Sequence, residues 1–128
     1  TCSTRCGYAR MLELACDGRL DFVADTREYA LRARRMKDIF LRHGFHIVYD
    51  RDVSAEVGDG FFFSLGYGDM HGGELLCELI KYGVSSINLA TTGSSRPGVR
   101  ACVSRMREEL YPLLDERMAA FAADHPLR

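Results

Sequence analysis

Apolar residues recur at helical spacing through the first third of the chain and predict two helices. The first covers residues 8–16, where Asp17 and Gly18 provide a stop signal. The second covers about residues 21–43 and ends before Gly44, because glycine is typical of the position that follows a helix. The apolar positions that we assign to the buried side of the long helix are Phe22, Tyr29, Leu31, Met36, Phe40 and Leu41.

A basic run at residues 32–35 of the long helix has two possible interpretations. It could contact phosphate, but Glu28 and Asp38 lie three or four residues from its members. Side chains at this spacing form ion pairs on the surface of a helix. We therefore expect a solvated helix face.

After Gly44 the apolar residues alternate, which predicts strands in place of helices. Four strands are expected, at residues 45–49, 61–67, 84–90 and 99–104. The first two are separated by a polar, glycine-containing loop at residues 50–60. In the third strand Ile87 and Leu89 alternate with Ser86 and Asn88, so we assign Ile87 and Leu89 to the buried side.

Two further helices are expected in the second half of the chain. One covers residues 74–82 and ends at Gly83, and its inward positions are Leu75, Leu76, Leu79 and Ile80. The last covers about residues 107–123, and Pro112 can occupy its first turn, where a missing N–H costs little. The positions that we expect this last helix to bury are Leu110, Leu113, Leu114, Met118 and Phe121.

The predicted order of elements is helix, long helix, strand, strand, helix, strand, strand, helix. This order indicates an α+β fold, with a small sheet of about four strands covered by helices in a two-layer sandwich. A long linking helix precedes the sheet. Between the last two strands, residues 91–98 form a loop of Thr, Gly, Ser, Arg and Pro that is too polar to belong to the core.

Composition narrows the classes of function. With 128 residues, of which 47% are hydrophobic, the chain has the size and apolar content of one globular domain. Its net charge of −1 arises from 17 basic and 18 acidic residues that are interleaved, so nucleic acid is not an expected partner. The apolar runs are shorter than the roughly 20 residues that a membrane-spanning helix needs, which predicts a soluble, cytoplasmic protein without a membrane partner.

Cysteine and histidine spacing argues against metal. The five cysteines are an odd number without the spacing of a disulfide scaffold, which favours reduced thiols. Cys2 and Cys6 could begin an iron–sulfur motif, but no further cysteine follows at close spacing. The four histidines show no zinc-binding spacing. We expect no metal site.

Arg100 is the residue with the clearest potential for chemistry. It occupies the polar side of an otherwise apolar predicted strand, directly after the Gly/Ser/Thr-rich loop. A planar guanidinium on a rigid strand can receive a carboxylate through two parallel hydrogen bonds. The alternative is an arginine on an edge strand that pairs with an acidic side chain of the same chain.

One long run in the second half combines these features. From Gly72 it reads GGELLCELIKYGVSSINLATTGSSRPGVRACVS, and REELYPLLDERM follows. This run resembles the small domain of class I/II (fold type I) aminotransferases, in which a helix ending in Gly-Val leads to a strand, a Gly/Ser-rich loop, an arginine-bearing strand and a last helix. The two N-terminal helices resemble the segment that links the family's large and small domains. The resemblance implies linking helices at residues 1–44 and a C-terminal small domain at residues 45–128.

The same resemblance assigns expected roles to individual residues. Arg100 matches the family arginine that binds the α-carboxylate of the substrate. The preceding loop is expected to lie near the substrate, and its candidate residues are Asn88, Thr91, Thr92, Gly93 and Ser94. The family often has Pro-Gly before this loop and Phe-Gly within it, whereas this chain reads Ala90-Thr91-Thr92-Gly93-Ser94.

The family's cofactor is pyridoxal phosphate, which is bound through a Schiff-base lysine. The chain has two lysines, Lys37 and Lys81, and both lie at polar positions of predicted helices, where we expect solvated side chains. We therefore expect the Schiff-base lysine to lie upstream of Thr1, in a larger homodimeric enzyme, and this chain to bind no cofactor covalently and to be inactive alone. No catalytic residue is expected within it.

The expected function is thus a part of an aminotransferase that moves an amino group between an amino acid and a 2-oxo acid. Two other interpretations remain open. The chain could be a free-standing α+β module that binds an amino acid through Arg100 without catalysis. It could also be a purely structural or interaction domain.

Overall fold

A computed structural model describes residues 2–57 and 60–127 of the chain. Its helices are α1 (Cys2–Cys16), α2 (Phe22–Arg42), α3 (Gly72–Lys81) and α4 (Tyr111–Asp124), with short 3-10 helices η1 (Leu89–Thr92) and η2 (Glu108–Leu110). Its strands are β1 (Phe45–Ile47), β2 (Arg51–Asp52), β3 (Ala55–Glu56), β4 (Phe62–Tyr67), β5 (Ile87–Asn88) and β6 (Val99–Cys102). Four strands form one antiparallel sheet in the order β1-β4-β6-β5, and β2 pairs with β3 in a separate hairpin.

The pairing of β4 with β6 assigns side chains to the two faces of the sheet. Phe63 is opposite Ala101 and Leu65 is opposite Val99, and all four are buried. Residues directly opposite each other share a face, and successive residues alternate between faces. Ser64 and its partner Arg100 therefore lie on the other face.

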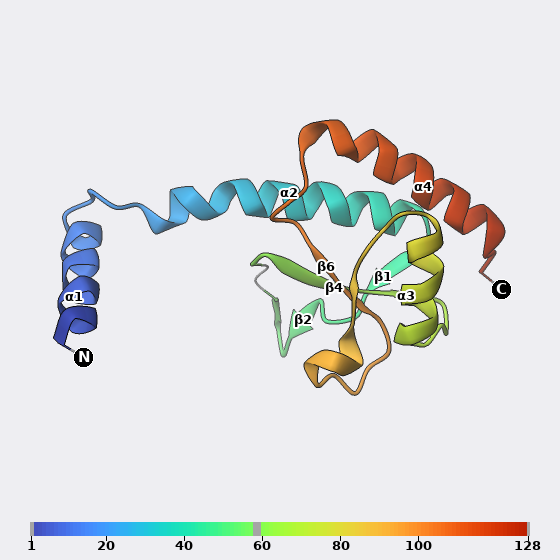
Figure 1. Ribbon diagram of the computed structural model, residues 1–128, viewed down its shortest axis with the longest axis horizontal. Helices are drawn as coiled ribbons and strands as arrows, with labels where there is room; N and C mark the ends of the chain where they lie inside the picture. The colour runs from blue at the N-terminus through green and yellow to red at the C-terminus, as the bar shows by residue number, and fades with distance from the viewer. Residues whose placement is uncertain (1, 58–59, 128) are drawn as a thin grey trace.

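All of the packed helices cover the same face of the sheet. In Figure 1, α2 and α4 lie next to each other on one side of the sheet, and α3 contacts β4, β5 and β6. The core joins Phe40 of α2, Leu75 of α3 and Phe121 of α4 to the apolar strand residues. Phe121 is fully buried, and its ring lies 5.3 Å from that of Phe45 and 5.0 Å from that of Tyr67. Among the described residues, no α-helix packs against the opposite face, which carries Arg100.

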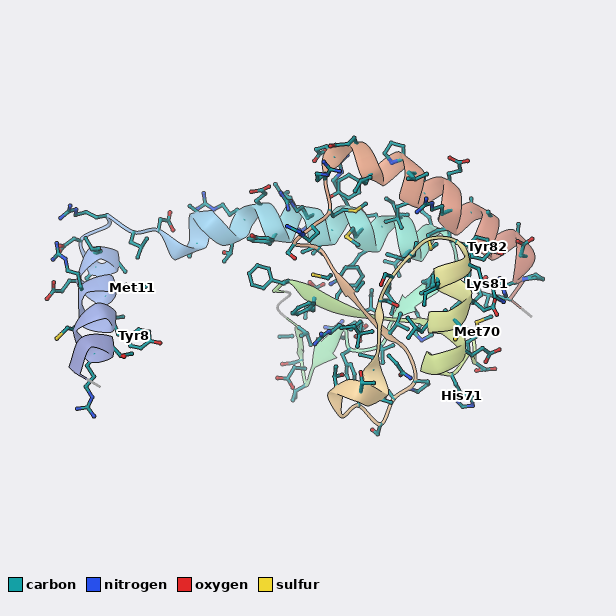
Figure 2. All side chains as sticks on the ribbon, in the orientation of Figure 1. Tyr8, Met11, Met70, His71, Lys81 and Tyr82 are labelled. Carbon is teal, nitrogen blue, oxygen red and sulfur yellow. The ribbon has the colours of Figure 1, made fainter. Side chains whose placement is uncertain are left out.

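The helix α1 stands apart from this core. Figure 1 shows it beyond the first turns of α2, away from the sheet, and Figure 2 shows Tyr8 and Met11 on it. Tyr8 and Leu12 are each 65% exposed, and Met11 is 44% exposed. Within the described residues, no helix has the length and apolar character needed to cross a lipid bilayer.

The predicted α+β class, with a small sheet covered by helices in two layers, is confirmed. The long helix also begins as its sequence indicates, because the carboxylate of Asp21 accepts hydrogen bonds from the backbone of Val23 and Ala24. Pro112 lies in the first turn of α4, as its sequence position indicated.

The assignment of buried helix positions was partly wrong. Four apolar residues that we assigned inward are exposed: Leu31, Leu41, Ile80 and Leu113. Each lies on a helix at the margin of the apolar stripe, where helical spacing alone does not tell how wide a strip the sheet covers. Phe22 was also assigned inward, but its side chain is not among those that the structure describes.

Two predictions about strands were also wrong. The third strand is only Ile87–Asn88, and Ile87, which we assigned inward, is exposed and opposite Arg100 on the open face. Residues 89–90 belong instead to η1, because the side chain of Asn88 accepts a hydrogen bond from Ala90 N at 3.0 Å and caps that short helix. The loop expected at residues 50–60 contains the hairpin of β2 and β3, and residues 58 and 59 lie outside the described ones.

We predict that Leu75→Ala destabilises the chain by about 3–5 kcal/mol, because the side chain is fully buried and its loss leaves a cavity. The matched change Leu12→Ala removes the same atoms from an exposed helix position and is expected to alter stability by less than about 0.5 kcal/mol. Urea denaturation monitored by circular dichroism measures both. Equal effects of the two substitutions would contradict the assignment of Leu75 to the core.

Candidate functional site

Arg100 lies in the middle of the open face of the sheet. Its strand β6 is an inner strand, with β4 on one side and β5 on the other. Ser64 is its partner on β4 and Ile87 its partner on β5. The neighbours of Arg100 along the strand, Val99 and Ala101, are buried in the core, so the backbone that carries the guanidinium is held on both sides.

The guanidinium lies against an aromatic ring and, among the described residues, has no acidic partner. Its Cζ lies 4.2 Å from the centre of the Phe62 ring, a cation–π contact. Its Nε is buried and has no hydrogen-bond partner among the described residues. Within residues 2–57 and 60–127, no aspartate or glutamate forms an ion pair with Arg100. Among the described residues, Arg100 therefore lies on an inner strand and not on an edge strand, and it has no acidic partner.

The rest of the open face is partly polar. His46 of β1 is opposite Gly66 of β4. A side chain at Gly66 would collide with the imidazole of His46, so the missing Cβ lets the ring lie across the strand. Ser64 is nearly buried at 8% exposure, and its Oγ accepts a hydrogen bond from Tyr49 N at 3.1 Å. Ile87 adds an exposed apolar side chain beside Arg100.

Of the five loop residues predicted from sequence, Asn88 is the last residue of β5, and the other four lie between β5 and β6. Asn88 is opposite Val99, the residue before Arg100. The Thr91 hydroxyl donates to Asn88 O at 2.7 Å, and the Thr92 hydroxyl donates to Leu89 O at 2.8 Å. These hydroxyls therefore hold η1 together, and their lone pairs remain available to accept further hydrogen bonds.

Two glycines shape the rest of the loop. Gly93 ends η1 in a left-handed conformation, with φ of 86°. Gly98 has φ of 143°, and a Cβ there would lie 2.5 Å from Leu65 O. The loop can therefore approach β4 closely only because residue 98 has no side chain.

The structure adds two residues that the sequence did not single out. Tyr49 and Arg96 contact each other and the loop, although they lie far apart in sequence. Neither belongs to a recognisable motif, and only the return of the loop toward β1 brings them together. The alternation of Phe62, Ser64 and Gly66 could have indicated which residues share the face of Arg100.

Both lysines lie away from the open face. Lys81 is at the C-terminal end of α3 (Figure 2), where its Nζ donates to both carboxylate oxygens of Glu78, at 2.6 and 2.8 Å. This contact holds the pKa of the Glu78 carboxyl below its usual value. Lys37, which we expected to be solvated, is half-buried, with Nζ 5.7 Å from the centre of the Phe63 ring on the helix-covered face.

Comparison with known proteins does not assign this site. No protein-family model matches the chain, and no curated protein matches its sequence.

We predict that Gly98→Ala destabilises the chain more than Gly93→Ala does. At Gly93 the new methyl group meets open space, so the cost is the left-handed backbone alone, about 1–2 kcal/mol. At Gly98 the methyl group also collides with Leu65 O, which adds about 1–3 kcal/mol. Thermal and urea denaturation compare the two variants. A Gly98→Ala variant as stable as Gly93→Ala would show that the loop does not pack against β4 in this way.

Proposed function

We propose that this chain supplies the substrate-carboxylate arginine of a pyridoxal-phosphate-dependent aminotransferase, an enzyme that moves an amino group between an amino acid and a 2-oxo acid. The observation that carries the proposal is the position of Arg100. Its guanidinium lies on an inner strand and stacks on Phe62, and its Nε has no hydrogen-bond partner within the part of the chain that the structure describes. The resemblance of the run from Gly72 to the small domain of that enzyme family supports the same role.

The chemistry of Arg100 fits a carboxylate better than other ligands. A guanidinium presents parallel N–H groups that match the two oxygens of a carboxylate. The buried Nε has no partner among the described residues, so the structure leaves hydrogen-bonding capacity of Arg100 unused. Stacking on Phe62 limits the orientations of the group, so less side-chain entropy is lost when a carboxylate binds.

The described residues do not fit pyridoxal phosphate by themselves. The cofactor requires a lysine close to the bound substrate, whereas Lys81 pairs with Glu78 and Lys37 lies against the helix-covered face. In this proposal the cofactor and its lysine belong to another segment of a cytoplasmic, homodimeric enzyme. The role of this chain is to bind and orient the amino acid through its carboxylate.

A second candidate is a module that binds an amino acid without catalysis. The position of both lysines away from Arg100 favours it, because the chain on its own can bind a carboxylate but offers no amine beside it. The two candidates differ in whether the same polypeptide also contains a lysine that binds pyridoxal phosphate. A lysine that binds pyridoxal phosphate in the same polypeptide decides for the enzyme.

We predict that propionate binds the isolated chain at Arg100. Titration of the isotope-labelled chain should shift the NMR signals of the Arg100 Nε–H group and of the amides of residues 99–101 in a saturable manner. Arg100→Lys keeps the charge but loses the planar pair of donors, so the affinity should fall roughly tenfold.

Two controls make the result specific. Arg105→Lys changes an exposed arginine shortly after β6 and should leave the affinity for propionate unchanged. Propionamide, which has no negative charge, should cause no saturable shift at Arg100. If Arg100→Lys binds propionate as well as the unchanged chain does, a structural domain becomes the better interpretation.

We also predict that the isolated chain forms no 2-oxo acid from an amino acid when pyridoxal phosphate and an acceptor 2-oxo acid are added. The reason is the absence of a lysine beside Arg100 in the described residues. A coupled dehydrogenase assay measures the product. Turnover that is lost in Lys37→Arg or Lys81→Arg would contradict the prediction and place the reactive lysine within this chain.

A further inference from the structure

Tyr49, Ser94 and Arg96 form a cluster that fastens the substrate loop to the segment after β1. The hydroxyl of Tyr49 lies 2.7 Å from Ser94 Oγ. The guanidinium of Arg96 lies 4.9 Å from the centre of the Tyr49 ring, and its Nη1 donates to Val48 O at 2.8 Å. The loop side chains of Ser94 and Arg96 therefore contact Tyr49 and Val48, which are consecutive in the segment after β1.

Ser94 is the centre of this cluster. Its Oγ donates to Arg96 O at 3.1 Å and accepts from Arg96 N at 3.0 Å. A serine hydroxyl carries one proton, so its contact with Tyr49 is one in which the tyrosine hydroxyl donates. Ser94 N in turn donates to Leu89 O at 3.2 Å, which closes the loop on itself.

The cluster is connected to the strand position beside Arg100. Val48 N donates to Ser64 O and Tyr49 N donates to Ser64 Oγ, each at 3.1 Å. Ser64 is the residue of β4 that pairs with Arg100. Arg96 is thus connected to Arg100 in two ways. One is through space, by way of Val48 and Ser64, and the other is along the chain, where Arg100 follows four residues after Arg96.

We propose that Tyr49, Ser94 and Arg96 are positioning residues, a latch that holds the loop in the place where Arg100 receives the substrate carboxylate. The inference rests on the proposed function of Arg100. None of the three touches the reacting atoms in this proposal. They act by fixing the loop and the start of β6.

The exposure of Tyr49 and Arg96 fits residues that position the loop better than residues that stabilise the whole chain. Tyr49 is 40% exposed and Arg96 is exposed, whereas the core lies on the other face of the sheet. Loss of a hydrogen bond near the surface changes global stability little, but it frees the segment that the bond ties down. Lysine cannot replace Arg96, because it lacks the planar group that stacks on Tyr49 while donating to Val48 O.

Two conservative variants test the latch in the 128-residue chain. Tyr49→Phe keeps the ring under Arg96 and removes only the hydroxyl, and Arg96→Lys removes the planar group. Each is compared with a matched change at an exposed site away from the loop, Tyr8→Phe or Arg105→Lys. The measurements are the propionate dissociation constant from the NMR signals of Arg100, hydrogen exchange at two amides, and Tm. The two amides are Ser94 N and Leu89 N, which donates to Gly98 O at 3.0 Å.

We expect each latch variant to raise the propionate dissociation constant and the exchange rate of both amides roughly two- to tenfold, the effect of one lost hydrogen bond. Tm should shift by only a few degrees. The double variant should lose less than the product of the two single effects, because both substitutions release the same loop. The Tyr8→Phe and Arg105→Lys variants should match the unchanged chain.

The outcomes separate the two proposals. If the unchanged chain binds propionate at Arg100 and the latch variants bind it equally well, the latch is overturned while the role of Arg100 stands. If propionate does not perturb Arg100 in the unchanged chain, the proposed function fails and the positioning role fails with it. Faster exchange at Ser94 N without a change in propionate affinity also overturns the positioning role.

Discussion

The antiparallel pairing of β4 with β6 is the constraint on which the rest of this structure depends. Its register directs Leu65 and Val99 into the core and Arg100 to the open face. Because side chains alternate with a period of two, a slip of one residue would send the guanidinium into the core and expose Val99. A lone buried charge is far more costly than a lost apolar contact. The forces that assemble the core therefore also orient Arg100.

The same pairing gives Ser64 two roles. On β4 it is the neighbour of Arg100, and beyond the strand its main-chain and side-chain oxygens receive the N–H groups of Val48 and Tyr49. Its near-complete burial means that these hydrogen bonds face little competition from water. The contacts that Val48 and Tyr49 make with the loop are thereby linked to the sheet through Ser64.

The sequence was sufficient for the existence of the four helices and for the order along the chain of the four strands in the main sheet, because each has a local signal such as period or cap. The sequence did not show which face of the sheet Ile87 occupies, because alternation over a two-residue edge strand is too short to assign the faces. The β2–β3 hairpin was missed because its turn contains Val53 at φ of 50° in place of the usual Asn-Gly or Asp-Gly. Tyr49 and Arg96 depend on a long-range contact that no local pattern encodes.

The helix α1 and the open face of the sheet share one feature, which is that no other described element covers them. A helix of 15 residues is near the limit of what remains helical in water without packing, and α1 exposes Tyr8, Met11 and Leu12. Apolar helix faces of this kind are typical of surfaces that another segment or protein covers. Arg100 likewise offers one wall of a site, and its hydrogen bonds to a carboxylate would strengthen if a second wall excluded water. Both features support the proposal that residues outside this chain complete the site that Arg100 begins.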